Sequence, residues 1–339
     1  MNKVKVFIII IIMISLSGNI YAEISKTGTS AAKFLSISIG PRAIAMGSAF
    51  SSISNDATAM YWNAAGIAQL EKNDIIFTHT NWIADININY VGLVLNLNEM
   101  GNLGINVTAM TMADMEVTTE YYPEGTGDTF GAGSYAFGLS YGRYLYNNFM
   151  IGVNIKYIRE SISQSDAQGF GIDIGTIFNT PFWGIKFASS ITNFGTKMHM
   201  TGDDLLLQTG IDDSRNGTND QLDADLRTDE YELPLRLQIG ISKDIMIRDQ
   251  RLTVAVDAAH PNDNTEYINI GAELAVLKEM AFLRGGYKTL FIADQEEGLS
   301  LGAGFNYDKM KSIELQIDYA FQRMKYLGDL HTFGLSFKF

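Results

Sequence analysis

The sequence predicts an all-β fold: a transmembrane antiparallel β-barrel of about fourteen strands, with a small N-terminal helical hatch that plugs its lumen. Three observations support this prediction. From Asp74 to the C-terminus, apolar and polar residues alternate with period two in one segment after another. Beyond the N-terminal leader, no stretch approaches the roughly twenty apolar residues of a membrane-spanning helix. The residues before Asp74 break the alternation and are rich in small side chains.

The chain begins with a predicted signal peptide at residues 1–22. Lys3 and Lys5 precede an apolar run, and Ala22 offers a small-residue cleavage site before Glu23. The run holds about nine to twelve apolar residues, which is too short to span a membrane as a helix. We therefore expect the chain to be exported and this segment to be removed.

Residues 23–72 are predicted to form the hatch, and residues 73–339 the outer-membrane barrel with a long acidic extracellular loop at 195–232. Most of the expected strands have the roughly ten-residue length of a tilted spanning strand. They are 74–83, 86–97, 101–120, 130–145, 149–163, 167–178, 183–194, 233–246, 250–259, 267–276, 280–288, 297–307, 311–320 and 331–339. The alternation slips phase near Tyr90 and Val91, which predicts a bulge.

The connections between these strands are expected to alternate in length. Every second connection is short, about three or four residues, as at 98–100 and 277–279, whereas the others include 121–129, 321–330 and 195–232. Outer-membrane barrels have short periplasmic turns and longer outer loops. The alternation therefore favours such a barrel over a soluble sandwich.

Aromatic residues cluster near the predicted strand ends. Two interpretations stay open for them: interfacial girdles of an outer-membrane barrel, and the ordinary composition of strands. The residues are Trp82, Tyr144, Tyr146, Phe182, Trp183, Tyr287, Phe305 and Tyr307.

If the apolar face of each strand meets lipid, the opposite face lines the lumen. Charged residues of both signs fall on this inward phase, namely Lys156, Asp173, Lys186, Arg236, Asp257, Glu273, Arg284, Glu314 and Asp318. Such a lumen is expected to be held together by ion pairs rather than to hold open a wide ion channel, so a general porin is disfavoured. Met110 and Phe282 share the phase and indicate a partly apolar interior.

Composition argues against several functions. A net charge of −13 and a pI near 4.7 leave too few Lys and Arg for a nucleic-acid partner. Cysteine is absent, so there is no disulfide, no thiolate metal site and no thiol nucleophile. The four histidines, His79, His199, His260 and His331, lack the spacing of metal ligands. We predict no catalytic residue, no enzymatic activity and no cofactor.

The connection 195–232 is rich in acidic residues. Three interpretations stay open: a solvated surface loop, a weak calcium site built from carboxylate oxygens, and a docking surface for a partner outside the cell. The residues concerned are Asp203, Asp204, Asp212, Asp213, Asp223 and Asp225. No spacing among them matches a twelve-residue calcium loop.

The hatch contains its own helix signals. Asn55 or Asp56 can cap a short helix, and Gly66 can end one. We expect these three residues, together with Trp62 and Asn63, to determine how the hatch packs. The Asn63 side chain is expected to form a hydrogen bond with the lumen wall.

The block from Gly28 to Ala68 resembles the N-terminal region of the PorV/PorQ family of outer-membrane proteins, which belongs with the FadL-like barrels. The likeness extends over nearly all of the mature chain and includes Asn193-Phe194-Gly195, 202–205, 260–264 and Arg284-Gly285-Gly286-Tyr287. The resemblance implies a fourteen-stranded barrel with a hatch, in agreement with the strand count. FadL-like hatches carry an Asn-Pro-Ala-Gly-type motif, matched here by Asn63-Ala64-Ala65-Gly66 with alanine in place of proline.

The resemblance implies a Gram-negative outer membrane as the location and its lipid as a neighbour. PorV/PorQ proteins are accessory components of type IX secretion, so the implied partners are secreted cargo proteins or secretion components. FadL-like relatives instead carry hydrophobic small molecules through a gated lumen and a lateral opening. A structural barrel without a transport role is the third possibility.

Overall fold

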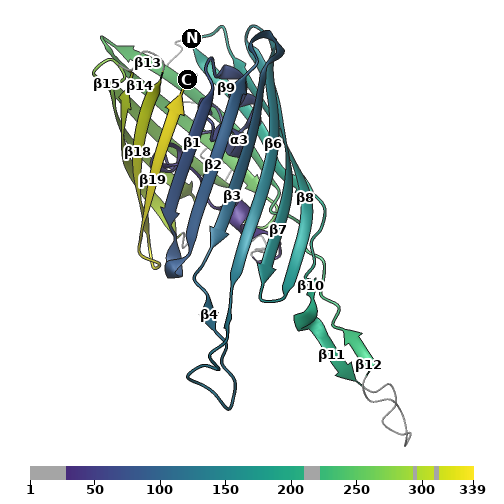
Figure 1. Cartoon of the computed structure of the whole chain (residues 1–339). Helices are drawn as coiled ribbons and strands as arrows, with labels where there is room; N and C mark the ends of the chain where they lie inside the picture. Colours follow the sequence, from purple (N-terminus) through teal and green to yellow (C-terminus); the bar gives the residue numbers. More distant parts are fainter. Residues whose placement is uncertain (1–27, 210–221, 293–295, 309–312) are drawn as a thin grey trace, which may run out of the picture.

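A computed structural model describes residues 28–209, 222–292, 296–308 and 313–339. Within them the chain forms a closed antiparallel barrel of fourteen strands with a few short helices (Figure 1). The predicted fold class is confirmed. The expected signal peptide at 1–22 and two residues of the acidic loop, Asp212 and Asp213, lie outside the described residues.

Each barrel strand pairs with its neighbours in sequence order, and the last strand pairs with the first to close the barrel. The strands are β1 (Asp74–Asn81), β2 (Asn87–Asn96), β3 (Asn102–Thr111), β6 (Ala132–Tyr146), β7 (Phe149–Ile162), β8 (Ser165–Asn179), β9 (Ile185–Gly195), β13 (Arg236–Ile247), β14 (Gln250–Pro261), β15 (Tyr267–Val276), β16 (Ala281–Leu290), β17 (Glu297–Tyr307), β18 (Glu314–Met324) and β19 (Asp329–Lys338). Short strands outside the barrel are β4 (Met115–Glu116), β5 (Thr129–Phe130), β10 (Thr201–Gly202), β11 (Leu206–Thr209) and β12 (Leu222–Asp225).

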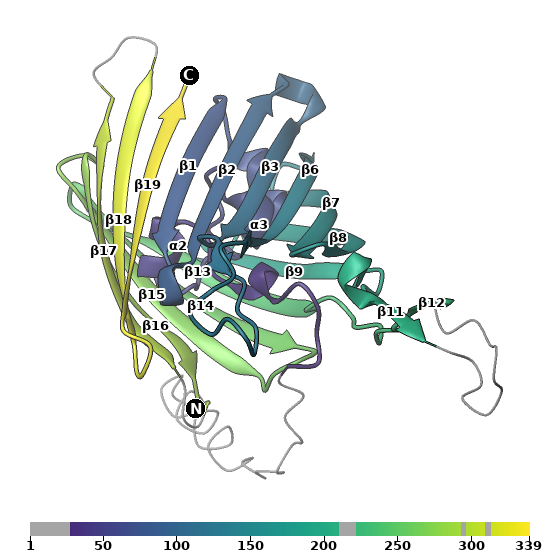
Figure 2. The ribbon, with the colours of Figure 1, turned by 60° about the horizontal axis from the view of Figure 1, so that its bottom comes forward.

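The two ends of the barrel differ in their connections. At the short-turn end, β6 and β7 are joined by 147–148. At the long-loop end, the connections 112–131 and 196–235 carry the short strands away from the barrel (Figures 1 and 2). The predicted alternation in length is only partly right, because the connections 163–164 and 325–328 at the long-loop end are also short. These two connections are short because β8 begins earlier, and β18 ends later, than the sequence predicted.

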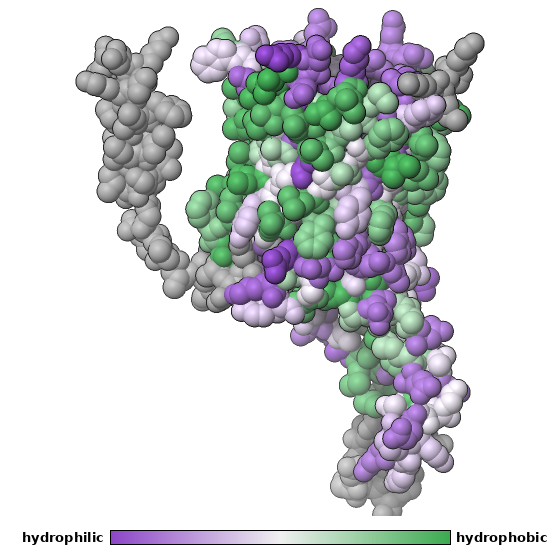
Figure 3. Space-filling model, turned by 90° about the vertical axis from the view of Figure 1, so that its left-hand side faces the viewer, coloured by the Kyte–Doolittle hydropathy of each residue, from purple (hydrophilic) through white to green (hydrophobic). Residues whose placement is uncertain are grey.

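Side chains alternate between the two faces of the wall. On β13, Leu237, Ile239 and Ile241 point outward and are exposed, whereas Arg236 and Gln238 point inward and are buried. Figure 3 shows the outward residues of one side as an apolar belt between hydrophilic rims. A barrel that sits in a bilayer presents such a belt to lipid.

The bulge predicted near Tyr90 and Val91 does not form. β2 pairs with β1 and with β3 without a register shift at these residues. The apolar pattern changes phase there because the inward side chains Ile88, Tyr90 and Val94 pack against apolar hatch residues. The inner face of a strand beside a hatch therefore does not have to be polar.

The hatch runs through the lumen from the long-loop end to the short-turn end. At the long-loop end the Ala31 N–H donates to the Glu232 carbonyl at 2.9 Å, and at the short-turn end the Leu70 carbonyl accepts from Asn96 at 2.6 Å. Between these points lie η1 (Lys33–Ser36), α2 (Pro41–Ala45), α3 (Ala59–Trp62) and η2 (Ala64–Gln69). In the described part of the chain, no helix is long and apolar enough to cross a membrane.

The apolar core lies between hatch and wall. Phe50 and Trp62 of the hatch pack with Ala255 of β14, and Ala65 packs with Met150 of β7. Among the described residues, each of five buried apolar clusters combines hatch residues with residues of the barrel. The barrel is thus packed around the hatch, which fills the lumen instead of leaving an open pore.

Glycines allow this close packing. A Cβ on Gly152 of β7 would lie 2.2 Å from the Ala64 carbonyl carbon, and a Cβ on Gly66 would lie 1.9 Å from the Ser54 carbonyl oxygen. The prediction that Gly66 ends a helix is wrong, because α3 ends at Trp62 and Gly66 lies inside η2. Its missing side chain instead lets two hatch segments touch.

Candidate functional site

Buried charges toward the short-turn end form one network. Glu273 of β15 accepts from the hatch residue Arg42 at 2.8 and 2.9 Å and from Arg284 of β16 at 2.7 Å. Arg251 reaches the same carboxylate at 3.2 Å, and Arg284 also bonds to Asp318. These contacts fasten α2 of the hatch to the wall.

Most other charges expected in the lumen are paired as well. Further ion pairs are Lys156–Asp173 (2.8 Å), Lys186–Asp244 (3.5 Å) and Lys72–Glu314 (3.3 Å). Asp257 accepts the backbone N–H groups of Phe50 and Ser51 at 3.0 and 2.9 Å, which ties the hatch to β14. Arg236 and Asp257 are the exceptions, since neither forms an ion pair with another of the described residues.

Two of the predicted hatch residues, Asn55 and Asp56, contact Arg42. The Asn55 Oδ1 accepts from the Arg42 Nη1 at 2.6 Å, and the Asp56 Oδ2 lies 3.6 Å from the same nitrogen. The Asp56 Oδ1 also accepts from the Thr58 N–H at 2.9 Å in the turn before α3. The prediction that Asn55 or Asp56 caps this helix is wrong, because its N-cap residue is Thr58. Both side chains therefore orient the arginine that contacts Glu273.

Asn63 and Trp62 lie where the hatch meets β8 and β13. The Asn63 Nδ2 donates to the Thr176 carbonyl of β8 at 3.1 Å, while its Oδ1 accepts from the Ala65 N–H at 3.1 Å. The Trp62 Nε1 donates to the Ile39 carbonyl at 3.0 Å, and the Arg236 guanidinium lies 5.6 Å from the Trp62 ring centroid.

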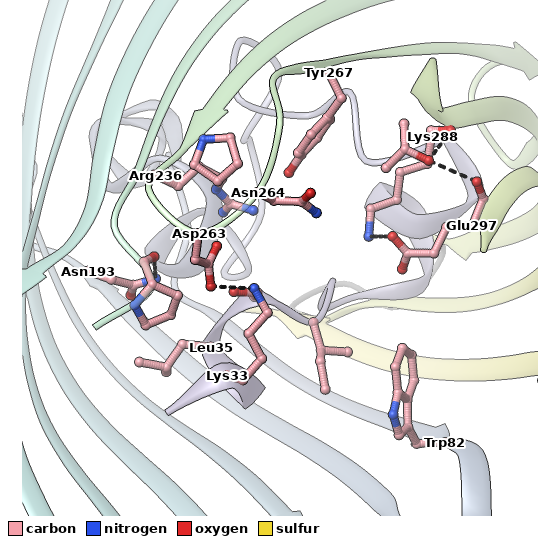
Figure 4. Close-up of a pocket in the computed structure, with 15 residues that line it drawn as sticks. Lys33, Leu35, Trp82, Asn193, Arg236, Asp263, Asn264, Tyr267, Lys288 and Glu297 are labelled. Carbon is pink, nitrogen blue, oxygen red and sulfur yellow. Dashed lines mark hydrogen bonds and ion pairs between the residues drawn. The ribbon is translucent and has the colours of Figure 1, made fainter. Parts of the chain in front are cut away.

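A cavity of about 350 Å³, here called the mouth cavity, lies inside the long-loop end (Figure 4). Its walls come from the start of the hatch, the β1–β2 connection and the ends of several strands from β9 to β17. The apolar lining includes Leu35, Ile37 and the rings of Trp82 and Tyr267. The cavity is therefore enclosed partly by aromatic and aliphatic surface.

The charged lining of the mouth cavity is not balanced. Lys33 pairs with Asp263 at 2.6 Å, and Lys288 pairs with Glu297 at 2.5 Å. Figure 4 shows Arg236 facing the same space as these two pairs. Within the described part of the chain, the Arg236 Nε has no hydrogen-bond partner. Three cations and two carboxylates thus line the cavity.

An apolar groove of about 400 Å³, here called the outer groove, lies on the outer face of the same part of the wall. Leu237, Ile239, Ile268 and the exposed Phe291 line it. Tyr267 lines both the mouth cavity and the outer groove. One residue of the wall thus contacts both spaces.

The wall is irregular beside Tyr267. The pairing of β15 with β16 shifts register between Ile268 and Ile270, so that Lys288 and Thr289 together face Asn269. Thr289 has a positive φ of 57°. A bulge of this kind interrupts the hydrogen-bonded ladder and bends the strand. Tyr267, which lines both the mouth cavity and the outer groove, therefore lies beside an interrupted part of the wall.

The acidic loop forms an arm that projects from the long-loop end (Figure 2). Asp204, in the turn Asp203–Leu205, accepts from the Gln164 N–H at 2.7 Å and fixes the base of the arm to the β7–β8 connection. Asp223 and Asp225 lie on β12. In the described parts of the arm and the barrel, no three His, Asp or Glu side chains are grouped to hold a metal ion.

Sequence reasoning placed Arg236 on the inner face of its strand but did not find the mouth cavity. Lys33 comes from the hatch, Asp263 from a loop and Lys288 from a bulge, where period-two alternation gives no signal. Trp82, considered above for an interfacial girdle, lines the cavity instead. The turn residues around Asp263 were the one sequence feature that could have indicated the cavity, because they bring polar groups to the end of a strand.

The comparisons with known proteins concern both sequence and fold. A model of the family described as "Uncharacterised protein family (UPF0164)" matches residues 13–196. No curated protein matches the sequence. Among solved structures, the CymD monoaromatic hydrocarbon channel is 13% identical with a TM-score of 0.55, covering 88% of this chain and 97% of that chain.

Two further structures have similar folds. The toluene transporter TodX of Pseudomonas putida is 12% identical with a TM-score of 0.56, covering 88% of this chain and 97% of that one. A FadL homologue of Pseudomonas aeruginosa is 12% identical with a TM-score of 0.50, covering 88% and 96%. The fold is thus that of FadL-like outer-membrane barrels, and nothing in these matches supports PorV/PorQ specifically.

Proposed function

The chain belongs to the uncharacterised protein family UPF0164, and from this premise and its FadL-like fold we propose that it is an outer-membrane channel for small hydrophobic molecules. Similar folds include a monoaromatic hydrocarbon channel and a toluene transporter. One observation in this chain carries the proposal: Tyr267 lines both the mouth cavity and the apolar outer groove. The surrounding partner is outer-membrane lipid, reached after removal of residues 1–22.

The proposed route uses only the long-loop end of the lumen and then crosses the wall. The hatch packs against the wall along the barrel, so a solute that enters from the long-loop end finds its way to the periplasm blocked. It passes Tyr267 at the β15–β16 bulge and leaves along the outer groove into the apolar belt of the barrel. For a hydrophobic solute this exit is favourable because bilayer hydrocarbon replaces water around it.

A disulfide across the bulge tests this route. Ile268 and Leu290 are paired, and the chain has no cysteine of its own, so Ile268→Cys with Leu290→Cys adds a single possible bridge. Paired strand positions have the separation that a disulfide requires. Oxidation should strongly slow the uptake of labelled toluene by cells or vesicles that contain the protein, and reduction should restore it.

The matched control joins the same two strands away from the bulge. Leu274→Cys with Leu283→Cys links another pair of β15 and β16 residues, where the register is regular. Oxidation of this variant should leave uptake unchanged. Equal uptake by the oxidised and reduced bulge variant would contradict the route, and a protein that never accelerates uptake would favour a structural barrel.

A second candidate function is an accessory role in type IX-like protein export, of the PorV/PorQ kind. The projecting acidic arm favours it, since a surface of this kind could dock secreted cargo or secretion components. Deletion of 203–230 should then abolish the crosslinking of such proteins in outer membranes and leave toluene uptake intact. If the deletion reduces toluene uptake but leaves the crosslinking unchanged, the docking role is contradicted.

A further inference from the structure

The mouth cavity contains a buried cation whose charge is not matched. Arg236 is 9% exposed, and its Nε has no hydrogen-bond partner among the residues that the structure describes. The other two cations of the lining, Lys33 and Lys288, each have a carboxylate partner. The lining therefore carries one positive charge in excess. This excess is local, because the chain as a whole has a net charge of −13.

Such an arrangement is energetically unfavourable without a partner. A buried charge that lacks a counterion loses hydration, and the loss is recovered only in part by weaker contacts. Arg236 has such contacts with the Trp62 ring, 5.6 Å from its guanidinium, and with the neighbouring phenols of Tyr61 and Tyr267. An anion at the guanidinium would restore the missing charge-assisted hydrogen bond.

The remaining lining limits the rest of the ligand. The volume of about 350 Å³ is at the lower end of the range for small-molecule sites, so the ligand is small. Trp82 and Tyr267 add aromatic surface, and Leu35 and Ile37 add aliphatic surface. Aromatic side chains pack favourably against a flat ring through stacked or edge contacts.

We propose that the mouth cavity binds a small aromatic carboxylate, whose carboxylate contacts Arg236 and whose ring lies against Tyr267 and Trp82. The excess of one positive charge matches a monoanion. The proposal rests on the proposed function, because the same cavity is the entrance of the channel, and it assigns to that entrance a binding site for an anionic aromatic ligand. Tyr267 would then contact both the bound ring and the outer groove.

Calorimetry with the full-length protein in detergent tests the proposal. The probes are 3-phenylpropionate, its neutral analogue 3-phenylpropanamide, acetate and inorganic phosphate. We expect 3-phenylpropionate to bind at least tenfold more tightly than each of the others, a difference of about 1.4 kcal/mol. Equal or tighter binding of the amide overturns the anion requirement, and equal binding of acetate or phosphate overturns the aromatic requirement.

Two substitutions locate the charge. R236M should reduce the preference for the carboxylate over the amide to near unity, while R236K should keep a measurable preference because it retains the charge. The control R159M removes a half-exposed arginine that pairs with Asp166 outside the mouth cavity, and its preference should match the native protein. An unchanged preference in R236M overturns the assignment. If R236M does not fold, the native probe series and R236K decide the question.

The outcome separates this proposal from the proposed function. Toluene carries no charge, so its uptake by the native protein is measured in parallel with carboxylate binding. Uptake of toluene without preferential binding of 3-phenylpropionate overturns the monoanion site and leaves the hydrocarbon route standing. Preferential binding without toluene uptake supports the site and contradicts the channel for neutral molecules.

Discussion

At the scale of single residues, the fit between hatch and wall depends on positions without a side chain. Gly285 and Gly286 are neighbours on β16 with opposite surroundings. A Cβ on Gly286 would lie 2.2 Å from the Gly47 nitrogen of the hatch, whereas a Cβ on Gly285 would meet only the Leu301 Cδ2 at 3.5 Å. One methyl group is therefore enough to test how tightly the hatch is held.

We expect Gly286→Ala to destabilise the protein and Gly285→Ala to be tolerated. The added methyl at Gly286 has to push against backbone, and overpacking of this kind costs about 1–3 kcal/mol. The check is the shift of the denaturant midpoint of the refolded barrel for both variants. Similar midpoints for the two variants would contradict the tight contact between the hatch and β16.

Asn63→Leu is expected to loosen the hatch. The substitution removes the donor to the Thr176 carbonyl of β8 and leaves buried polar groups unpaired, at a cost of about 1–3 kcal/mol. Asn89→Leu is the control, since that amide bonds to His79 on the outer face and its loss should change stability by no more than about 0.5 kcal/mol. Unchanged thermal stability of Asn63→Leu would argue against its role at the wall.

At the scale of elements, the strands were predictable and the irregularities were not. Lipid on one side imposes period-two alternation, and residues such as Leu237 and Ile239 reveal it directly. The same reasoning failed at Tyr90, because an inner face that packs on an apolar hatch gives the same pattern as a phase slip. The bulge at Thr289 gave no signal, because one extra residue leaves the local composition unchanged.

The candidate site, too, was predictable only in part. Arg236 belongs to a regular strand, so the inward direction of its side chain followed from the alternation. The excess positive charge of the mouth cavity could not be predicted, because Lys33 and Asp263 neutralise each other across 230 residues of sequence. Pairing at that separation depends on the path of the hatch, which local sequence does not encode.

The contact of α2 with the wall gives a prediction at this scale. Glu273 receives hydrogen bonds from Arg42 of the hatch and from Arg284 of the wall, with Arg251 beside them. Glu273→Gln leaves these arginines around a neutral amide, and breaking a buried pair from one side costs about 3–5 kcal/mol. Arg42→Met leaves the carboxylate with two arginines and should cost less.

The measurement compares the two variants by their melting midpoints and by the rate at which a protease cleaves the hatch. We expect Glu273→Gln to melt at the lower temperature and to be cleaved faster. If Arg42→Met is the more damaged of the two, the carboxylate is not the centre of the network.

At the scale of the whole molecule, the barrel is closed in two different ways. Its wall is closed by pairing between β1 and β19, and its lumen is closed by the hatch that threads from Ala31 to Leu70. The hatch contributes to every buried apolar cluster, so it cannot leave without exposing the inner face of the wall. Under the proposed function, a solute would therefore have to pass through the wall, and hydrophilic molecules would be excluded.

A barrel whose lumen is closed by its hatch should select solutes by polarity. Vesicles containing the native barrel should not swell in iso-osmotic arabinose, because a sugar cannot enter the apolar outer groove without losing its hydration. Gly152→Leu, whose side chain would collide with the backbone at Ala64, should displace η2 and permit swelling. Gly285→Leu adds the same side chain beside Leu301, away from the hatch backbone, and should stay impermeable. Rapid swelling of vesicles with the native protein would mean that the lumen conducts despite the hatch, and the lateral route would lose its main support.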